Sequence, residues 1–269
     1  METNMKLGIY YDCYKGLDDR TRVALMKKND FECTFLHSSS ERLYEEVRAI
    51  READITVESL HAPYPTAEGG IDDLWIDGER GEEALSEIYD CIEKCVRCEV
   101  PTLVVHPTST GHPTYPSEIG LFRFERVFQR AREYGVSIAF ENVCCFDVLL
   151  YLLEQFPEAG FCWDAGHEAF ERRGKRHMPL FASRLQLLHL HDNYLCKDIH
   201  LLPYDGKIKF SRVARQIAES PYEGSVMLEV KKSWGGIYDM LSPAAYYERA
   251  RMAAERIERK ISEIRAEKK

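Results

Sequence analysis

The sequence lacks any run of about 18 apolar residues, the length that a membrane-spanning helix requires. Residues 1–13 contain no apolar stretch of the kind found in a signal peptide. The nine cysteines are odd in number and therefore do not suggest a complete disulfide framework. We expect a protein of the reducing cytoplasm that makes no contact with a membrane.

Glycine-rich phosphate and dinucleotide motifs are also missing. The first apolar run continues as Tyr-Asp-Cys-Tyr-Lys-Gly, ending at Gly16, without the glycine spacing of a nucleotide-binding turn. Basic residues are not in excess, since 36 Lys and Arg stand against 45 Asp and Glu and give a formal net charge of -9. This balance disfavours a broad nucleic-acid surface. We expect a small-molecule partner and no nucleotide cofactor.

Short apolar runs alternate with helix-like segments along the chain. The runs that read as strands are 7–11, 31–36, 55–61, 102–106, 136–141, 160–164, 185–191 and 226–230. The segments that read as helices are 18–28, 40–52, 82–98, 119–134, 146–155, 178–183, 210–220 and 243–269. Cys91, Cys95 and Cys98 have the spacing of one buried helix face, the alternative being a thiolate metal site.

This alternation predicts an α/β fold consisting of a single (β/α)8 TIM barrel over residues 1–269. Such barrels occupy about 200 to 250 residues as one domain. Several predicted strands are apolar without interruption, which is typical of parallel strands covered on both faces. An open doubly wound sheet is the structural alternative, but it normally has the glycine-rich first turn that this sequence lacks.

Polar residues that can bind a metal stand at the ends of six consecutive predicted strands. In an α/β barrel the chemistry lies at the carboxyl ends of the strands and in the loops that follow. In chain order the candidates are His61, His106, Glu141, Asp164, His167, His189 and Glu229, and Asp198 and His200 stand in the loop after the seventh strand.

Three of these candidates, Glu141, Asp164 and Glu229, are carboxylates beside apolar strands. Buried together they would repel one another unless a cation lay among them. We do not expect Lys231 alone to neutralise all three. A mixture of carboxylate oxygen and imidazole nitrogen suits Mn2+, Zn2+, Co2+ or Fe2+ better than Ca2+. The sequence therefore predicts a divalent transition metal as cofactor.

The ordered set of motifs resembles the xylose isomerase-like TIM-barrel superfamily, which joins sugar isomerases and epimerases with endonuclease IV-like apurinic-site endonucleases. The matching pieces are His61-Ala-Pro-Tyr, Val-Val-His106-Pro, Phe-Glu141-Asn142, Trp-Asp164-Ala-Gly-His167, His189-Leu-His191-Asp192-Asn193, Asp198-Ile-His200 and Leu-Glu229-Val. The resemblance implies that Glu141, Asp164, His189 and Glu229 are shared metal ligands. It also implies that the two glutamates flank the substrate and move protons.

The endonuclease branch of the superfamily implies additional ligands. There His61, His106, His167, Asp198 and His200 would complete a trinuclear zinc cluster. The endonucleases carry Asn where this chain has His191, and they place an Arg after the second strand, where this chain reads Phe-Leu-His-Ser-Ser-Ser over 35–40. Both differences disfavour DNA repair, which stays the alternative function.

We therefore expect a divalent-metal-dependent isomerase or epimerase that acts on a small sugar or sugar derivative. Glu141 and Glu229 are the catalytic candidates, for proton transfer beside a carbonyl through an enediolate. The candidates for substrate contacts are His61, Asn142, His191 and Lys231. The number of metal ions stays open, as does assembly into a homo-oligomer.

Overall fold

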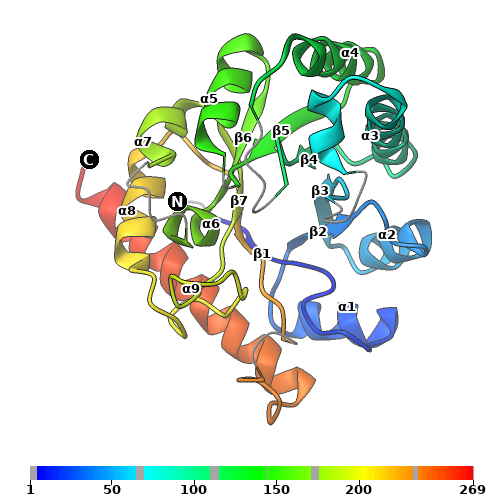
Figure 1. Cartoon of the computed structure of the whole chain (residues 1–269). Helices are drawn as coiled ribbons and strands as arrows, with labels where there is room; N and C mark the ends of the chain where they lie inside the picture. The colour runs from blue at the N-terminus through cyan, green and yellow to red at the C-terminus, as the bar shows by residue number, and fades with distance from the viewer. Residues whose placement is uncertain are drawn as a thin grey trace. The chain divides into compact units, whose positions relative to one another are not determined.

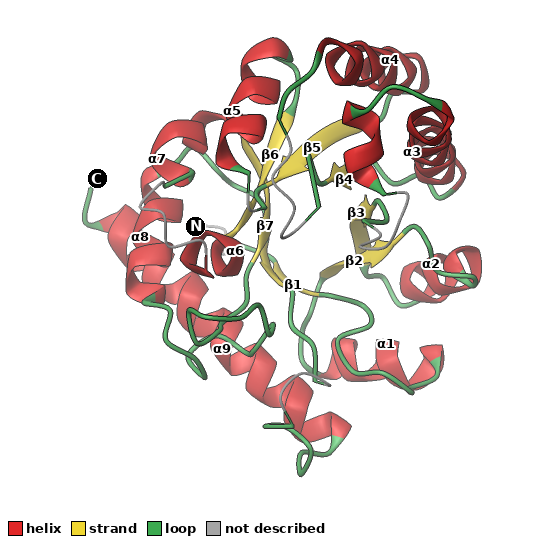
Figure 2. Ribbon diagram, viewed as in Figure 1, coloured by secondary structure: helices red, strands yellow, loops and turns green. Residues whose placement is uncertain are grey.

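The computed structural model describes residues 5–64, 70–109, 115–143, 145–170, 176–232 and 236–268. The strands are β1 (Leu7–Ile9), β2 (Cys33–His37), β3 (Thr56–His61), β4 (Thr102–Val105), β5 (Ser137–Glu141), β6 (Gly160–Asp164), β7 (Leu185–His189) and β8 (Val226–Leu228). The α-helices are α1 (Asp19–Lys28), α2 (Leu43–Glu52), α3 (Glu79–Arg97), α4 (Glu118–Tyr134), α5 (Phe146–Gln155), α6 (Ala165–Phe170), α7 (Met178–Phe181), α8 (Phe210–Glu219) and α9 (Pro243–Ala266). Strands and helices alternate along the chain (Figures 1 and 2).

The strands form one eight-stranded parallel sheet with the order β7-β6-β5-β4-β3-β2-β1-β8. The two strands at the ends of this order, β7 and β8, are also linked by hydrogen bonds through Leu190, which follows β7. The Leu190 N–H donates to the Met227 carbonyl at 3.0 Å, and the Glu229 N–H donates to the Leu190 carbonyl at 3.0 Å. The predicted (β/α)8 TIM barrel is confirmed.

The chain divides into two compact units, and the division passes inside β2, β3 and β6. Unit 1 comprises Met1–Phe35, Glu45–Val57 and Trp163–Lys269, and unit 2 comprises Leu36–Tyr44 and Glu58–Cys162. Candidate site residues from position 164 onward belong to unit 1, and those from 61 to 142 belong to unit 2. A single domain over the whole chain stays a prediction.

In unit 1, β1 pairs with β8 in parallel register, with Leu7 opposite Val226 and Ile9 opposite Leu228. Both strands are buried along their whole length. Outside them α8 packs against α9 (Figure 1). The long helix α9 begins at Pro243, and the preceding Ser242 side chain accepts the Ala245 N–H at 3.3 Å as an N-cap.

In unit 2, β4 and β5 are paired from Thr102 opposite Ser137 to Val105 opposite Phe140, and α3 packs against α4. The cysteines of α3 are buried, as the helical spacing predicted. Burial raises the pKa of the Cys91 thiol to about 11, which keeps it protonated at neutral pH.

Two elements were not predicted from the sequence. The short helix α6 follows β6 at once because the Asp164 carboxylate accepts the His167 N–H at 2.6 Å and so caps it. The 3-10 helix η1 (Ile71–Trp75) is fixed by Trp75, whose indole N–H donates to the Pro107 carbonyl at 2.8 Å. Within the described segments, no helix combines the length and apolarity needed to cross a membrane.

Candidate metal centre

Three buried side chains converge at the ends of the last three strands, all within unit 1. Asp164 ends β6, His189 ends β7 and Glu229 directly follows β8. Each offers a ligand-type atom within 4.8 Å of the others. The His189 Nδ1 atom lies 3.1 Å from Glu229 Oε2, and none of the three residues is more than 3% exposed. Two carboxylates and one imidazole thus face one another out of water.

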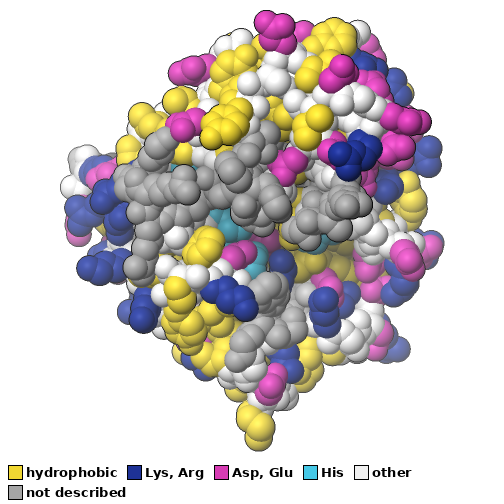
Figure 3. Space-filling view, in the orientation of Figure 1, with side chains coloured by type: hydrophobic (Ala, Val, Ile, Leu, Met, Phe, Trp, Pro, Cys, Tyr) yellow, Lys and Arg dark blue, Asp and Glu magenta, His cyan; other side chains and the backbone are white. Residues whose placement is uncertain are grey.

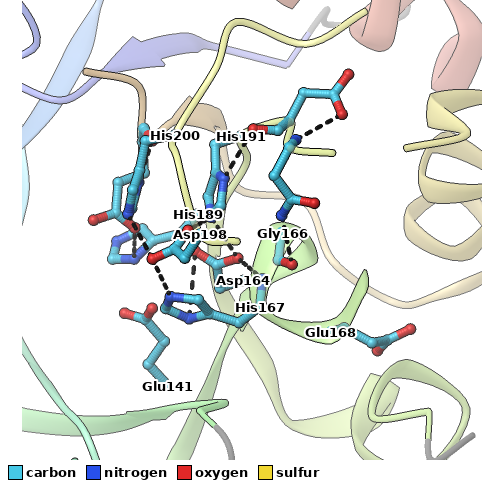
Figure 4. Close-up of polar contacts among 12 residues, drawn as sticks. Glu141, Asp164, Gly166, His167, Glu168, His189, His191, Asp198 and His200 are labelled. Carbon is cyan, nitrogen blue, oxygen red and sulfur yellow. Dashed lines mark hydrogen bonds and ion pairs between the residues drawn. The ribbon is translucent and has the colours of Figure 1, made fainter. Parts of the chain in front are cut away.

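A second group of ligand-type side chains lies on the segments that follow β6 and β7 in the same unit. Its members are His167, His191, Asp198 and His200, each with a ligand-type atom within 4.8 Å of the others. Asp198 Oδ2 lies 3.1 Å from Nε2 of His200 and 3.4 Å from Nε2 of His167. Asp198 Oδ1 lies 3.5 Å from His191 Nε2. Three imidazole nitrogens therefore surround one carboxylate (Figure 4).

The far ring nitrogens of two of these histidines face carbonyl oxygens. His200 Nδ1 lies 2.9 Å from the Glu229 carbonyl oxygen, and His191 Nδ1 lies 3.4 Å from the Asp192 carbonyl oxygen. Because a carbonyl only accepts, each Nδ1 carries the proton when the ring is neutral, and the lone pair is then on Nε2. In both rings the nitrogen that can bind a metal is the one that faces Asp198.

The loop between β7 and α8 is shaped by Asp192. Its Oδ1 atom accepts the backbone N–H groups of Asn193 and Ile208 at 2.8 and 2.9 Å. Its Oδ2 atom accepts those of Tyr204 and Gly206 at 3.0 and 2.9 Å. One carboxylate therefore ties together both ends of the segment that presents Asp198 and His200. Burial raises the pKa of Asp192 above its ordinary value even though these four N–H groups lower it.

His200 adopts a backbone conformation that L-residues seldom use. Its φ is 43°, in the left-handed region. Such strain persists only where the surrounding structure over-determines it, and it is concentrated at functional sites. Here the strained residue delivers an imidazole into a cluster of ligand-type side chains.

Unit 2 contains a separate group of His61, His106 and Glu141. Glu141 ends β5, and its Oε2 atom lies 3.1 Å from His61 Nε2 and 3.6 Å from His106 Nε2. His61 Nδ1 lies 2.7 Å from the Ala62 carbonyl oxygen, which leaves Nε2 directed at the carboxylate. Tyr64 stacks on His106 with ring centroids 4.5 Å apart, so it is packed against this group.

Each of the three carboxylates that the sequence predicts to need a cation has an imidazole neighbour. Glu229 faces His189, Glu141 faces His61, and Asp164 Oδ1 lies 3.1 Å from His191 Nε2. A protonated histidine or a bound cation can neutralise such a carboxylate. On the face drawn in Figure 3, histidine surface appears only in small areas, in keeping with this burial.

The charges around Asp198 favour a cation among these side chains. Burial alone would lower the pKa of His191, but the charge and hydrogen bond of Asp164 and the charge of Asp198 raise it to about 9. Burial alone would raise the pKa of Asp198, but hydrogen bonds from His167 and His200 hold it well below its usual range. A site that stabilises a proton on His191 in this way also suits a divalent cation.

The predicted substrate contacts lie in different places. Asn142 is fully buried just after β5, in unit 2. Lys231, in unit 1, places its Nζ atom 4.0 Å from Glu229 Oε1 and 5.8 Å from the centre of the Tyr10 ring. His191 lies among ligand-type side chains. The roles of these residues stay predictions.

The sequence assigned no role to Asp192 or Gly166. The available signal for Asp192 in the sequence is an acidic residue directly after a His-x-His strand end. Gly166 is in contact with His191, since a Cβ atom on it would lie 2.0 Å from the His191 Cε1 atom. Only the folded chain shows that this glycine makes room for the ring.

Comparison with protein families gives one match over most of the chain. The model of the family described as "Xylose isomerase-like TIM barrel" matches residues 23–257. A protein of Sinorhizobium fredii, named "Uncharacterized protein y4fM", is 31% identical over 142 residues. That match covers 52% of this chain and 44% of the relative, so the chain spans less than half the length of this curated protein.

Solved structures share the fold at low identity. The D-psicose 3-epimerase of Clostridium cellulolyticum, solved with D-tagatose, has a TM-score of 0.75 and 17% identity and covers 96% of this chain and 99% of its own. A D-tagatose 3-epimerase-like protein has a TM-score of 0.73 at 18% identity, covering 98% and 99%. The protein IolI, described with a bound zinc atom, has a TM-score of 0.71 at 16% identity, covering 97% and 99%.

Proposed function

Because the chain belongs to the xylose isomerase-like TIM-barrel family, we propose that it is a divalent-metal-dependent isomerase or epimerase of a small sugar or sugar derivative. The observation that carries the proposal is the buried convergence of Asp164, His189 and Glu229 at the carboxyl ends of three strands of unit 1. Active sites of this fold lie at that end of the strands.

The donor set fits a divalent transition metal. Asp164, His189 and Glu229 offer two carboxylates and one imidazole, a combination suited to Mn2+, Co2+ or Zn2+. On the family resemblance alone, we propose Glu141 as a further ligand and as the second group that transfers a proton. A metal held there would polarise the substrate carbonyl and stabilise the negative charge of an enediolate.

Of the two proposed proton-transfer groups, Glu141 and Glu229, Glu229 has contacts on both carboxylate oxygens within unit 1. Its Oε2 atom lies against His189 Nδ1 at 3.1 Å, which orients the carboxylate, and Oε1 lies 4.0 Å from the Lys231 ammonium. With Glu229 ionised, one oxygen can accept the proton from the carbon beside the carbonyl and return it to the product. Lys231 would bind a hydroxyl or an acidic group of the substrate, and His61 and Asn142 would bind hydroxyls.

The sugar class of the substrate is suggested by the proteins that share the fold. The names of two of them refer to 3-epimerisation of D-psicose and D-tagatose. These activities belong to those proteins. The first ketoses to test with this chain are D-psicose, D-tagatose and D-fructose, the last being the C3 epimer of D-psicose and the sugar in whose presence another protein of this fold was solved.

The test is a proton-exchange assay in deuterated water. Protein stripped of metal and reloaded with Mn2+, Co2+ or Zn2+ is incubated with each ketose, and deuterium beside the carbonyl is measured by NMR together with the product sugar. We expect exchange only in metal-loaded protein, and we expect Glu229→Gln to lower the rate by about 100- to 10,000-fold, the usual contribution of a general base. Glu125→Gln, which removes an exposed carboxylate of α4, is the matched control and should keep full exchange. Equal exchange in Glu229→Gln and wild type would overturn the proposed role.

A second function, incision of abasic DNA, is favoured by one observation. The ligand-type residues form more groups than a single ion needs, with His61, His106 and Glu141 in unit 2 and the Asp198 group in unit 1. Clustered zinc ions can activate water for phosphodiester hydrolysis. Incision of a synthetic abasic duplex by zinc-loaded protein, without exchange on any ketose, would favour this alternative.

A further inference from the structure

We propose that His167, His191, Asp198 and His200 form a closed four-ligand zinc site that fixes the β7–α8 loop and has no open position for chemistry. The resemblance carried by the sequence implies only three of these ligands. His191, expected there to contact substrate, is the fourth, and it changes the character of the site. The proposal does not rest on the proposed isomerase function, because a closed structural ion is compatible with any reaction at the neighbouring centre.

The ligand-type atoms of this group lie within 4.8 Å of one another, and each histidine lies near one of the two Asp198 oxygens. A zinc ion with bonds of about 2.1 Å separates its ligand atoms by about 3.4 Å. The Nε2 atoms of the three histidines lie 3.1, 3.4 and 3.5 Å from oxygens of Asp198. Only small side-chain shifts would therefore bring four donors around one ion. Three imidazoles and one carboxylate are ordinary zinc ligands.

The surroundings of His191 hold its ring in a fixed position. Gly166 lies so close that a Cβ atom there would be 2.0 Å from the ring. The carbonyl of Gly166 accepts the Asn193 Nδ2–H at 3.0 Å, which ties α6 to the residue two positions beyond His191. His191 is fully buried and stacks on the His200 ring with centroids 4.1 Å apart.

Two of the ligands also have outer partners that direct Nε2 toward Asp198. The Glu229 carbonyl faces Nδ1 of His200, and the Asp192 carbonyl faces Nδ1 of His191. Such partners are the usual companions of metal-binding histidines. His191 Nε2 also lies 3.1 Å from Asp164 Oδ1, and bound zinc would replace any proton at that nitrogen.

Closure of the site has a functional consequence. Structural zinc sites use four protein ligands, whereas catalytic sites keep one position for water or substrate. With His191 as fourth ligand, this ion cannot activate a water molecule. It would instead hold Asp198 and His200, which lie on the same loop, to His167 on α6. A closed ion of this kind would not catalyse hydrolysis of abasic DNA.

The test uses Co2+ and Zn2+ as probes on the full chain. Metal-stripped wild type and His191→Ala are titrated with Co2+, and the visible absorption of four-coordinate cobalt is recorded. We expect strong absorption in wild type and loss of the closed-site component in His191→Ala. Zinc affinity, measured by competition with a coloured chelator, should fall on the order of 100-fold or more, because even outer partners of zinc ligands contribute 10- to 100-fold. His177→Ala removes another buried histidine of unit 1 that belongs to none of the ligand groups and should leave both readings unchanged.

Gly166→Ala and Glu229→Gln test the zinc site independently of His191→Ala. If His191→Ala does not fold, Gly166→Ala displaces the ring by contact, without strain in its own backbone, and should lose the same cobalt component. Glu229→Gln should slow ketose exchange yet retain the cobalt component, so failure of the proposed function and failure of the zinc site are distinguishable. Equal zinc affinity in wild type and His191→Ala, or weak six-coordinate cobalt absorption in wild type, would overturn the proposal.

Discussion

Replacement of Asp192 by Asn should loosen the loop that carries Asp198 and His200 without removing any ligand. The carboxylate accepts four backbone N–H groups, two on each oxygen. An amide keeps one oxygen and turns an NH2 group toward the other two donors. Each buried donor left unsatisfied costs about 1 to 3 kcal/mol, which gives about 2 to 6 kcal/mol for two.

The net loss should lie near the lower end of this range. Burial raises the pKa of Asp192, which means that the folded protein holds its charge at some cost, and a neutral Asn avoids that cost. We therefore expect the free energy of unfolding to fall by about 2 to 3 kcal/mol, and zinc affinity at the Asp198 group to fall with it.

The assay is urea unfolding followed by tryptophan fluorescence and circular dichroism, with zinc competition on the same samples. Asp239→Asn, which removes an exposed carboxylate 3.4 Å from Lys232, is the control and should change stability by no more than about 1 kcal/mol. An Asp192→Asn protein as stable as this control, with unchanged zinc affinity, would refute the role given to Asp192.

Three further outcomes are expected. Arg123 donates hydrogen bonds to the carbonyls of Asp73 and Leu74 in η1. Arg123→Met leaves both buried carbonyls unsatisfied, at about 1 to 3 kcal/mol each, so the free energy of unfolding in urea titration should fall by about 2 to 6 kcal/mol. A loss below about 1 kcal/mol would contradict this. Ser117 Oγ accepts the Gly120 N–H at 3.1 Å and caps α4. Ser117→Ala removes this N-cap and should lower the free energy of unfolding by about 1 kcal/mol in the same assay. Ser117→Thr keeps a hydroxyl and should retain most of that stability. A metal ion present at 100 times its Kd stabilises the folded protein by about 2.7 kcal/mol. Removing the metal with a chelator should therefore lower Tm by about 5 to 10 °C. An unchanged Tm would contradict the binding of an ion.

The barrel could be predicted because its strands and helices are encoded locally. The predicted ends of β3, β5 and β6 at His61, Glu141 and Asp164 are the observed ones, since each apolar run stops at a polar residue. The predicted helix over 146–155 is also found at those positions. Periodicity and charged strand ends are sufficient signals for this level of structure.

The grouping of side chains could not be predicted to the same depth, because it depends on contacts between distant residues. Asp192 bonds to Ile208, sixteen positions away, and no periodic pattern announces such a loop. The pairing of Asp164 with His191 likewise joins the end of β6 to the segment after β7, which the sequence shows only as separate runs. The sequence predicts His191 as a substrate contact, and only the folded chain places its ring beside Asp164 and Asp198.

The central claim is that Asp164, His189 and Glu229 hold a divalent metal. Crystals grown with Mn2+ or Zn2+ and measured at the absorption edge of the ion test it directly. We expect an anomalous peak at about 2.0 to 2.3 Å from ligand atoms of all three residues. A map without a peak among them, with His189 still paired to Glu229, would contradict the account.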